Sequence, residues 1–350
     1  MTLLNKFVVR VALFGILLKL LLCVLDLRLP FYYGDSGLIY KNVMHTKYNH
    51  LVDNNEKYNS IFVGSSISYR QVNSALFDSL SCIKTSSFNF GNPGTLIPES
   101  FYILENTIES LQHKPEYVFL ELMLPANNMV NGFAMDSPKW RYYLNSSYFK
   151  LHHKILNTSF LMKKNAKNFI NNFLGVGLIK LKLLYFSGLI EQHDEILGTN
   201  NDGYLSLDLE FNTSPNEELI SRKQLFKTLG KRLFKKRLNE IKESGSFKES
   251  DYVSAPIISQ KVQELISLAE EKSIHLFIFV PQYELYKESI QHVFDQIPAE
   301  NRLSVSDIEE FPFLENMDFY YDHGHLNARG AKLFTEALAK KFNESVDCIN

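Results

Sequence analysis

Two short motifs carry the side chains that a nucleophilic enzyme needs. Gly64-Ser65-Ser66 follows an apolar run, and Asp322-His323-Gly324-His325 precedes a helix-like run. A serine hydroxyl becomes a nucleophile when a histidine takes its proton, and a carboxylate beside the histidine fixes the required tautomer. The two motifs together predict a Ser–His–Asp site for acyl transfer.

The first motif assigns the nucleophile to Ser66. Gly64 permits a sharp turn, and Ser66 would begin the next helix, where backbone N–H groups can face an oxyanion. A Gly-Ser pair after a strand is more often a plain turn. The first motif therefore indicates a nucleophile only in combination with the second motif, which supplies the acid and the base.

In the second motif, Asp322 stands three residues before His325 and can reach the imidazole Nδ1, which leaves Nε2 free to take a hydroxyl proton. His323 competes for the role of base. We prefer His325 because Asn327 and the start of the helix would hold it rigidly. Two histidines and one aspartate are too few for a metal site, so we expect no metal and no other cofactor.

A third motif, Asn89 to Gly94, reads Asn-Phe-Gly-Asn-Pro-Gly and bends the chain tightly. The common meaning of such a stretch is a plain turn. The functional interpretation is that the Gly94 N–H points into the site as an oxyanion donor. Asn89 and Asn92 are then candidates for substrate contact.

The elements that must position these motifs alternate between strand and helix. Strand patterns cover 60–63, 85–90, 117–122, 275–280 and 300–305, and helix patterns cover 71–80, 98–112, 257–272, 283–295 and 328–342. This alternation predicts an α/β three-layer sandwich with a mostly parallel sheet of roughly five strands. Ligands bind such sheets beyond the carboxyl ends of the strands, where all three motifs fall.

The chain divides into five predicted segments. They are a signal anchor (1–30), a linker with a helix (31–57), the first half of the α/β core (58–126), a mostly helical insertion (127–254) and the second half of the core (255–345). In the insertion, Trp140, Tyr142 and Tyr143 could stack on sugar rings, although core packing is an equal alternative. The basic stretch 222–242 is typical of a solvated helix face; contact with anionic lipid or polymer is the alternative.

The N-terminus predicts a membrane anchor. Residues 7–29 are apolar enough for a span of roughly 20 residues, and no small-x-small cleavage site follows, which favours an uncleaved anchor. Lys6 and Arg10 precede the apolar centre, so we expect a single-pass protein with an extracytoplasmic body, periplasmic or extracellular. Lys19 either snorkels to the interface or faces a partner membrane protein.

Composition argues against nucleic acid as a partner and leaves a disulfide between Cys82 and Cys348 undecided. The formal net charge is −2, so no global field favours nucleic acid. Cys23, Cys82 and Cys348 show no C-x-x-C spacing. Cys82 and Cys348 either form a disulfide or are a chance pair.

Together, the motifs resemble those of the SGNH hydrolase superfamily, also called GDSL-type esterases, whose fold is flavodoxin-like. The Gly-Asp-Ser block of that family corresponds to Gly64-Ser65-Ser66, its asparagine and later oxyanion glycine to Asn89 and Gly94, and its Asp-x-x-His block to Asp322 and His325. The resemblance implies a Ser66 nucleophile, an Asp322–His325 acid and base, and an oxyanion hole from the N–H groups of Ser66 and Gly94.

The chain departs from the family at its third block, Gly-x-Asn-Asp. Glu121-Leu122-Met123-Leu124-Pro125 stands there, so the third oxyanion donor is missing from its usual place. Asn127 or Asn128 is a candidate substitute. Loss of one such donor can cost on the order of 10²–10³ in rate.

The anchor makes the chain similar to bacterial envelope proteins that work beside membrane-bound O-acyltransferases, such as the D-alanyl transfer and alginate acetylation proteins. The resemblance implies O-acyl transfer, with acetyl favoured, to a cell-surface polysaccharide, or ester hydrolysis on it. A membrane-bound O-acyltransferase is the implied partner. The alternative is a non-catalytic protein of the same fold that binds glycan or that acyltransferase.

Overall fold

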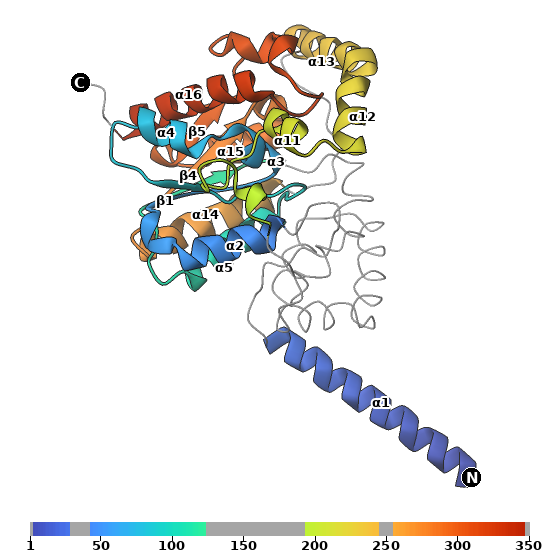
Figure 1. Ribbon diagram of the computed structural model, residues 1–350. Coiled ribbons are helices and arrows are strands. Elements are labelled where there is room, and N and C mark those ends of the chain that lie inside the picture. Colours follow the sequence, from blue (N-terminus) through green and yellow to red (C-terminus); the bar gives the residue numbers. More distant parts are fainter. Residues whose placement is uncertain (1–2, 29–42, 124–192, 245–254, 347–350) are drawn as a thin grey trace.

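The computed structural model describes residues 3–28, 43–123, 193–244 and 255–346. Within them, five parallel strands form one sheet in the order β2-β1-β3-β4-β5 (Figure 1). The strands are β1 (Ser60–Val63), β2 (Ser87–Asn89), β3 (Tyr117–Glu121), β4 (His275–Pro281) and β5 (Arg302–Val305). This confirms the predicted α/β class and its parallel sheet.

The strand order places a topological switch point beside β1. Ser60 pairs with Ser87 of β2 on one side and with Tyr117 of β3 on the other. The order 2-1-3-4-5 is that of doubly wound sheets, which bind ligands beyond the carboxyl ends of the strands on either side of the switch point. The ends of β1 and β3 are therefore where a site is expected.

Helices cover both faces of the sheet because successive strand residues point to opposite faces. Ile61 and Val63 pack into one buried apolar cluster, and Phe62 packs into the other, where its ring stacks on Phe119 with centroids 4.5 Å apart. The first cluster includes residues of α2 (Val43–Asp53), α5 (Glu99–Ser110), α14 (Ala255–Glu271) and α15 (Glu288–Asp295).

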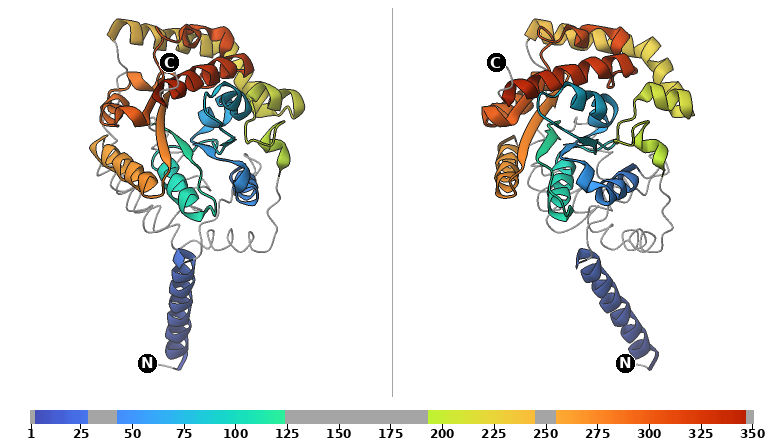
Figure 2. Two further views of the ribbon diagram at one scale, coloured as in Figure 1. Left: turned by 90° about the vertical axis from the view of Figure 1, so that its left-hand side faces the viewer. Right: turned by 60° about the vertical axis from the view of Figure 1, so that its left-hand side comes forward.

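The second face is covered by α4 (Ser74–Leu80), α13 (Lys231–Ser244) and α16 (Ala328–Ser345). The short helix α3 (Ser66–Gln71) packs on α16. Figure 2 shows α13 and α16 on one side of the sheet and α5 and α14 on the other. The sheet is thus the middle layer of three.

Two predicted helices have other bounds. The helix predicted over 71–80 is α4, which begins at Ser74 because Asn73 caps it by accepting the Leu76 N–H at 3.1 Å. A separate short helix, α3, capped by Ser65, precedes it. The helix predicted over 283–295 is a 3₁₀ turn, η5 (Glu284–Tyr286), followed by α15. Further 3₁₀ turns are η2 (Asn55–Lys57), η6 (Ala299–Asn301), η7 (Pro312–Glu315) and η8 (Met317–Phe319).

The described part of the predicted insertion is helical. It contains η3 (Asp194–Leu197), α11 (Leu207–Thr213), α12 (Glu217–Leu225), a π-helical turn η4 (Phe226–Gly230) and α13. Phe226, Phe234, Leu238 and Ile241 turn inward to the second cluster. Residues 127–192 and 245–254 of the predicted insertion lie outside the described residues.

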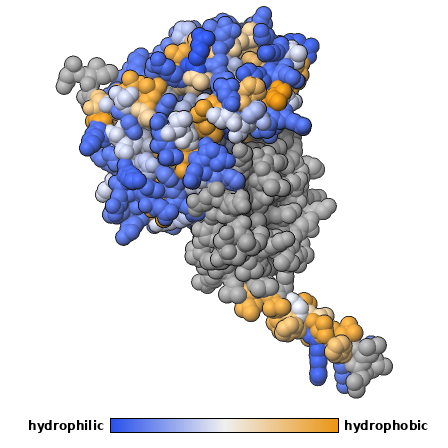
Figure 3. Space-filling model, in the orientation of Figure 1, coloured by the Kyte–Doolittle hydropathy of each residue, from blue (hydrophilic) through white to orange (hydrophobic). Residues whose placement is uncertain are grey.

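A separate helix, α1 (Leu3–Arg28), covers the segment predicted to be the anchor. Large apolar side chains from Phe7 to Leu21 are exposed along it (Figure 3). Across the ranges that the structure describes, no helix is long and apolar enough to cross a membrane. The membrane span stays a prediction.

Cys82 is disulfide-bonded. Its N–H donates to Asn343 Oδ1 at 3.0 Å, close to the end of α16. Cys348, the partner considered from the sequence, lies outside the described residues.

Candidate active site

The turn that carries Ser66 lies at the carboxyl end of β1. Ser65 caps α3 by accepting the Ile67 N–H at 3.0 Å, so Ser66 is the first residue of the helix. The first N–H groups of a helix have no carbonyl partner within it. The Ser66 N–H therefore has no carbonyl partner within α3, and its predicted role as an oxyanion donor stays a prediction.

A buried carboxylate at the end of β3 fixes this turn. Glu121 Oε2 accepts the N–H groups of Ser65 and Ser68, both at 3.0 Å, and its Oε1 accepts the Ser65 hydroxyl at 2.6 Å. The Ser68 hydroxyl donates to Oε2 at 2.5 Å. A Cβ at Gly64 would overlap the side chains of both Glu121 and Ser68, so only glycine fits there.

Glu121 belongs to the core by its environment, since it is 2% exposed. Burial raises the pKa of its carboxyl, and the hydrogen bonds from Ser65 and Ser68 oppose that rise. The N–H groups of Ser65 and Ser68 are taken by this carboxylate. Of the N–H groups in the turn, that of Ser66 remains as the candidate oxyanion donor.

The loop after β2 lies against the same turn. The Asn92 N–H donates to the Gly64 carbonyl at 2.9 Å, and the Thr95 N–H donates to the Asn92 carbonyl at 3.3 Å. Pro93 and Gly94 (φ 69°) occupy the middle of this turn, as in a type II β-turn. The predicted oxyanion glycine thus lies on a loop that is hydrogen-bonded to the turn of residues 64–68, which carries the predicted nucleophile and is called the nucleophile turn below.

Asn89 and Asn92 have internal roles. The Asn89 side-chain amide donates to the carbonyls of Ser68 and Val72, both at 2.7 Å, and its Oδ1 accepts the Gly91 N–H at 2.9 Å. The Asn92 amide donates to the Phe90 carbonyl at 2.8 Å. Both side chains are buried. The Asn89 bonds join the loop to α3, and the Asn92 bond lies within the loop. Substrate contact by these two residues stays a prediction.

Lys47 of α2 contacts the loop after β2 through its side-chain nitrogen. Its ammonium donates to the carbonyls of Asn89 at 2.9 Å and Gly91 at 2.7 Å, and lies 3.7 Å from the centroid of the Tyr69 ring. Burial and then the Arg70 charge lower the pKa of Lys47, against a smaller opposing effect of Asp202. The Lys47 nitrogen is therefore buried and held by two carbonyls and an aromatic ring.

The three predicted catalytic side chains form one hydrogen-bonded row. His325 Nε2 lies 2.8 Å from Ser66 Oγ, and His325 Nδ1 lies 2.9 Å from Asp322 Oδ1. Asp322 Oδ1 also accepts the N–H groups of Gly324 and His325, both at 2.8 Å. The tautomer with the proton on Nδ1 lets the carboxylate accept it and leaves Nε2 to take the Ser66 proton.

Local structure orients the Asp322–His325 loop. The Tyr321 N–H donates to the His325 carbonyl at 2.9 Å, and Tyr320 and Leu326 form an antiparallel bridge. Asn327 then caps α16 by accepting the Gly330 N–H at 3.0 Å. These bonds hold the backbone before and after His325. Asn327 and the start of α16 contribute to them, which is why His325 was preferred over His323 as the base.

Arg222 of α12 joins the row from the insertion. Its Nε donates to Asp322 Oδ2 at 2.9 Å, and its Nη2 contacts both the same oxygen and, at 3.0 Å, His325 Nδ1. The Asp322 side chain is 4% exposed. Burial alone would raise the pKa of Asp322, but the His325 contacts and the Arg222 charge outweigh it and hold that pKa well below its usual range.

His323 does not take part in the hydrogen-bonded row. Burial lowers the pKa of its imidazole, with Asp322 opposing and the charges of Arg237, His325 and Arg222 assisting. A partly buried imidazole with a lowered pKa is mostly neutral near pH 7. The geometry therefore favours His325, whose Nε2 contacts Ser66, as the base.

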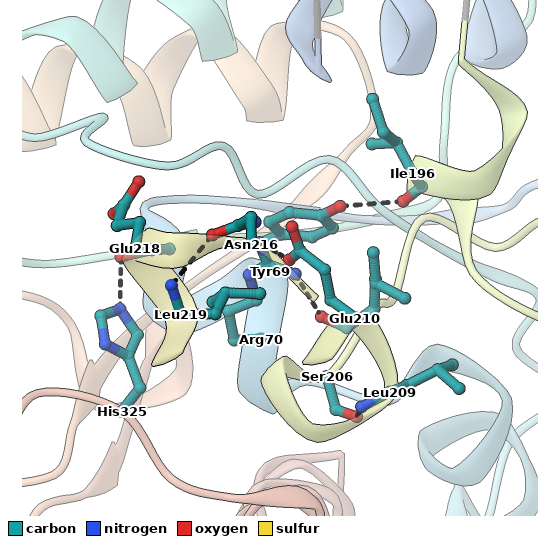
Figure 4. A network of polar contacts seen from close by, with 12 residues as sticks. Tyr69, Arg70, Ile196, Ser206, Leu209, Glu210, Asn216, Glu218, Leu219 and His325 are labelled. Atoms are coloured by element: carbon teal, nitrogen blue, oxygen red, sulfur yellow. Dashed lines mark hydrogen bonds and ion pairs between the residues drawn. The ribbon is translucent and has the colours of Figure 1, made fainter. Parts of the chain in front are cut away.

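Polar contacts tie the insertion to the region of α3 and the triad loop (Figure 4). The Tyr69 hydroxyl donates to the Ile196 carbonyl at 3.0 Å, and Arg70 pairs with Glu210 of α11. Asn216 caps α12 by accepting the Leu219 N–H at 2.9 Å. Figure 4 shows Glu218, in the first turn of α12, beside His325.

Several predicted residues lie outside the described ranges: Asn127, Asn128, Trp140, Tyr142 and Tyr143. Within the described ranges, no group of three or more His, Cys, Asp and Glu side chains could hold a metal ion.

The sequence predicts no role for three residues of the site. Arg222 stands in a basic stretch that is typical of solvated helices, and Lys47 stands in a polar stretch typical of a linker helix. Glu121 stands where the SGNH third block would begin, but that position gives it no role. A charged residue at the end of an otherwise apolar buried strand was the available signal for Glu121.

Neither a protein-family model nor a curated protein sequence matches the chain.

Proposed function

We propose that this protein is a serine-dependent acyl-transfer enzyme of the SGNH type. It moves an O-acyl group, with acetyl favoured, to a bacterial cell-surface polysaccharide or removes one by ester hydrolysis. The observation that carries the proposal is the row of Ser66 Oγ, His325 Nε2 and Nδ1, and Asp322 Oδ1, with distances of 2.8 and 2.9 Å. The parallel sheet with this site at the carboxyl ends of β1 and β3 supports it.

In the proposed mechanism, His325 Nε2 takes the Ser66 proton while Ser66 Oγ attacks the acyl carbonyl. The resulting oxyanion accepts the N–H groups of Ser66 and Gly94. His325 gives its proton to the leaving oxygen as the bond to the acyl carbon breaks, which leaves an acyl-serine. A sugar hydroxyl or water, deprotonated by His325, then attacks this ester, and the proton returns to Ser66.

The envelope assignment rests on the N-terminal segment rather than on the site. A signal anchor over residues 7–29 would place the α/β body outside the cytoplasm and beside the bilayer. The polysaccharide acceptor and a membrane-bound O-acyltransferase as partner follow from the resemblance to anchored envelope proteins.

The test is covalent labelling of the purified full-length protein in detergent with a fluorophosphonate probe. We expect stoichiometric labelling at Ser66, no labelling of Ser66→Ala, and at least 10³-fold slower labelling of His325→Ala, in line with losses of catalytic triad members. Ser79→Ala is the matched control, because Ser79 is an exposed serine of α4 whose hydroxyl donates to the Leu76 carbonyl of its own helix.

Absence of labelling in a folded wild-type protein would contradict the proposal. It would favour the alternative, a non-catalytic partner of the same fold that binds glycan or a membrane acyltransferase. Thermal unfolding of each variant distinguishes loss of chemistry from loss of the fold.

A further inference from the structure

Arg222 is a charged residue of the insertion whose guanidinium contacts two members of the proposed triad, Asp322 and His325. Its Nε and Nη2 both contact Asp322 Oδ2, whereas Asp322 Oδ1 receives His325 Nδ1 and two loop N–H groups. His325 Nδ1 also lies 3.2 Å from Oδ2, farther than its 2.9 Å from Oδ1, whereas the two Arg222 nitrogens contact Oδ2. The carboxylate cannot rotate without breaking several bonds at once.

We propose that Arg222 is a positioning residue for the triad: by occupying Asp322 Oδ2 it presents Oδ1 to His325. The inference rests on the proposed function, since it assigns Arg222 a role in the reaction of Ser66. Asp322 lies in the last segment of the chain and Arg222 lies 100 residues earlier, in the insertion. The insertion therefore completes the active site.

The choice of donors supports this role. A guanidinium has only donors and cannot accept the Nδ1 proton, so the Nδ1–H of the base-competent tautomer must go to Asp322. Arg222 Nη2 lies 3.0 Å from Nδ1. If the carboxylate turned away, that N–H could donate to an unprotonated Nδ1 instead, which would leave the proton on Nε2 and block base catalysis. Two bonds to Oδ2 oppose this arrangement.

Contacts other than those of Arg222 hold α12 and the preceding helix α11 against the loop that carries Asp322. The Tyr321 hydroxyl donates to the Leu219 carbonyl at 3.0 Å, Asp208 Oδ2 accepts the Ala328 N–H at 2.7 Å, and Leu207, Leu219 and Tyr321 form a small apolar cluster. A substitution at Arg222 therefore removes the guanidinium and leaves these contacts in place. The Arg222 side chain is 30% exposed, so a neutral side chain there can be solvated.

The experiment compares fluorophosphonate labelling rates of the full-length protein and five variants. We expect Arg222→Gln to label about 10 to 100-fold more slowly, the range for a misplaced catalytic group. Arg222→Lys should recover part of the rate, because it restores the charge but not the two-point contact. Arg232→Gln is the control, since it removes the same side chain from an exposed position of α13.

The double variant tests whether Arg222 acts through Asp322. In an Asp322→Asn background, Arg222→Gln should slow labelling less than twofold further, because residues that act as a unit are not additive. A merely structural role would give additive losses.

Three results would overturn the inference while leaving the proposed function intact. They are an unchanged rate for Arg222→Gln, a faster rate, and additive losses in the double variant, in each case with wild type still labelled at Ser66. A wild-type protein that takes no label would instead contradict the proposed function.

Discussion

The two halves of the site are held in different ways. The nucleophile turn is fixed from the core: Glu121, at the end of a buried strand, holds Ser65 and Ser68 on either side of Ser66. The loop that carries the proposed acid and base, Asp322 and His325, is the acid–base loop. Bonds between residues three or four apart hold it locally, and Arg222 of the insertion contacts it from a partly exposed position. Damage to the first half should therefore reduce stability and activity together, and damage to the second should mainly reduce activity.

The largest effect is expected from Glu121→Ala. It would leave the N–H groups and hydroxyls of Ser65 and Ser68 without their acceptor in a buried site, so we expect a loss of about 3 kcal/mol or more in the free energy of unfolding. Labelling of Ser66 should fall with it. Urea unfolding and fluorophosphonate labelling provide the two measurements.

Glu121→Gln is the matched variant, because its amide keeps one acceptor oxygen at the same place. It should lose less stability than Glu121→Ala. Equal and small losses for both would mean that the buried carboxylate does not hold the turn, and the comparison between the two halves would fail.

Lys47→Met should have the second largest effect. Methionine fills the same volume but leaves the carbonyls of Asn89 and Gly91 unpaired, for a loss of about 2–3 kcal/mol. Because these carbonyls belong to the loop that carries Gly94, labelling at Ser66 should also slow. A stable variant with normal labelling would separate this loop from the nucleophile turn.

The smallest effect is a difference in pH dependence between the halves. The pKa of Asp322 is lowered in the folded protein, so its contribution to stability is complete above the usual value of 3.8 and is lost as the pH falls below it. The pKa of Glu121 is raised, so its contribution is greatest below the usual value of 4.5 and is lost as the pH rises through the folded value.

Urea unfolding of wild type, Asp322→Asn and Glu121→Gln from pH 3 to 8 checks these opposite signs. The stability gap between wild type and Asp322→Asn should narrow toward pH 3, and the gap between wild type and Glu121→Gln should narrow toward pH 8. Gaps that stay constant with pH would show that neither carboxyl titrates differently on folding.

Much of the fold could be predicted because its pattern is local. Ser60–Val63 and Tyr117–Glu121 are short apolar runs bounded by polar or turn residues, and the predicted strands match the observed ones within about two residues. The bounds of the short helix α3 were not predicted, because its sequence, Ser-Ile-Ser-Tyr-Arg-Gln, is rich in serine and β-branched or aromatic residues and its start depends on the Ser65 cap.

The sequence by itself determined the α/β class and the candidate triad, because strand–helix alternation and the Asp-x-x-His spacing are read along the chain. Only the tertiary structure decided which charges surround that triad. Glu121, Lys47 and Arg222 act across 56, 42 and 100 residues, and contacts at such separations leave no periodic trace. Their roles follow from burial, because a charged group removed from water needs polar partners beside it. Which partners lie beside it depends on the folded arrangement of distant segments.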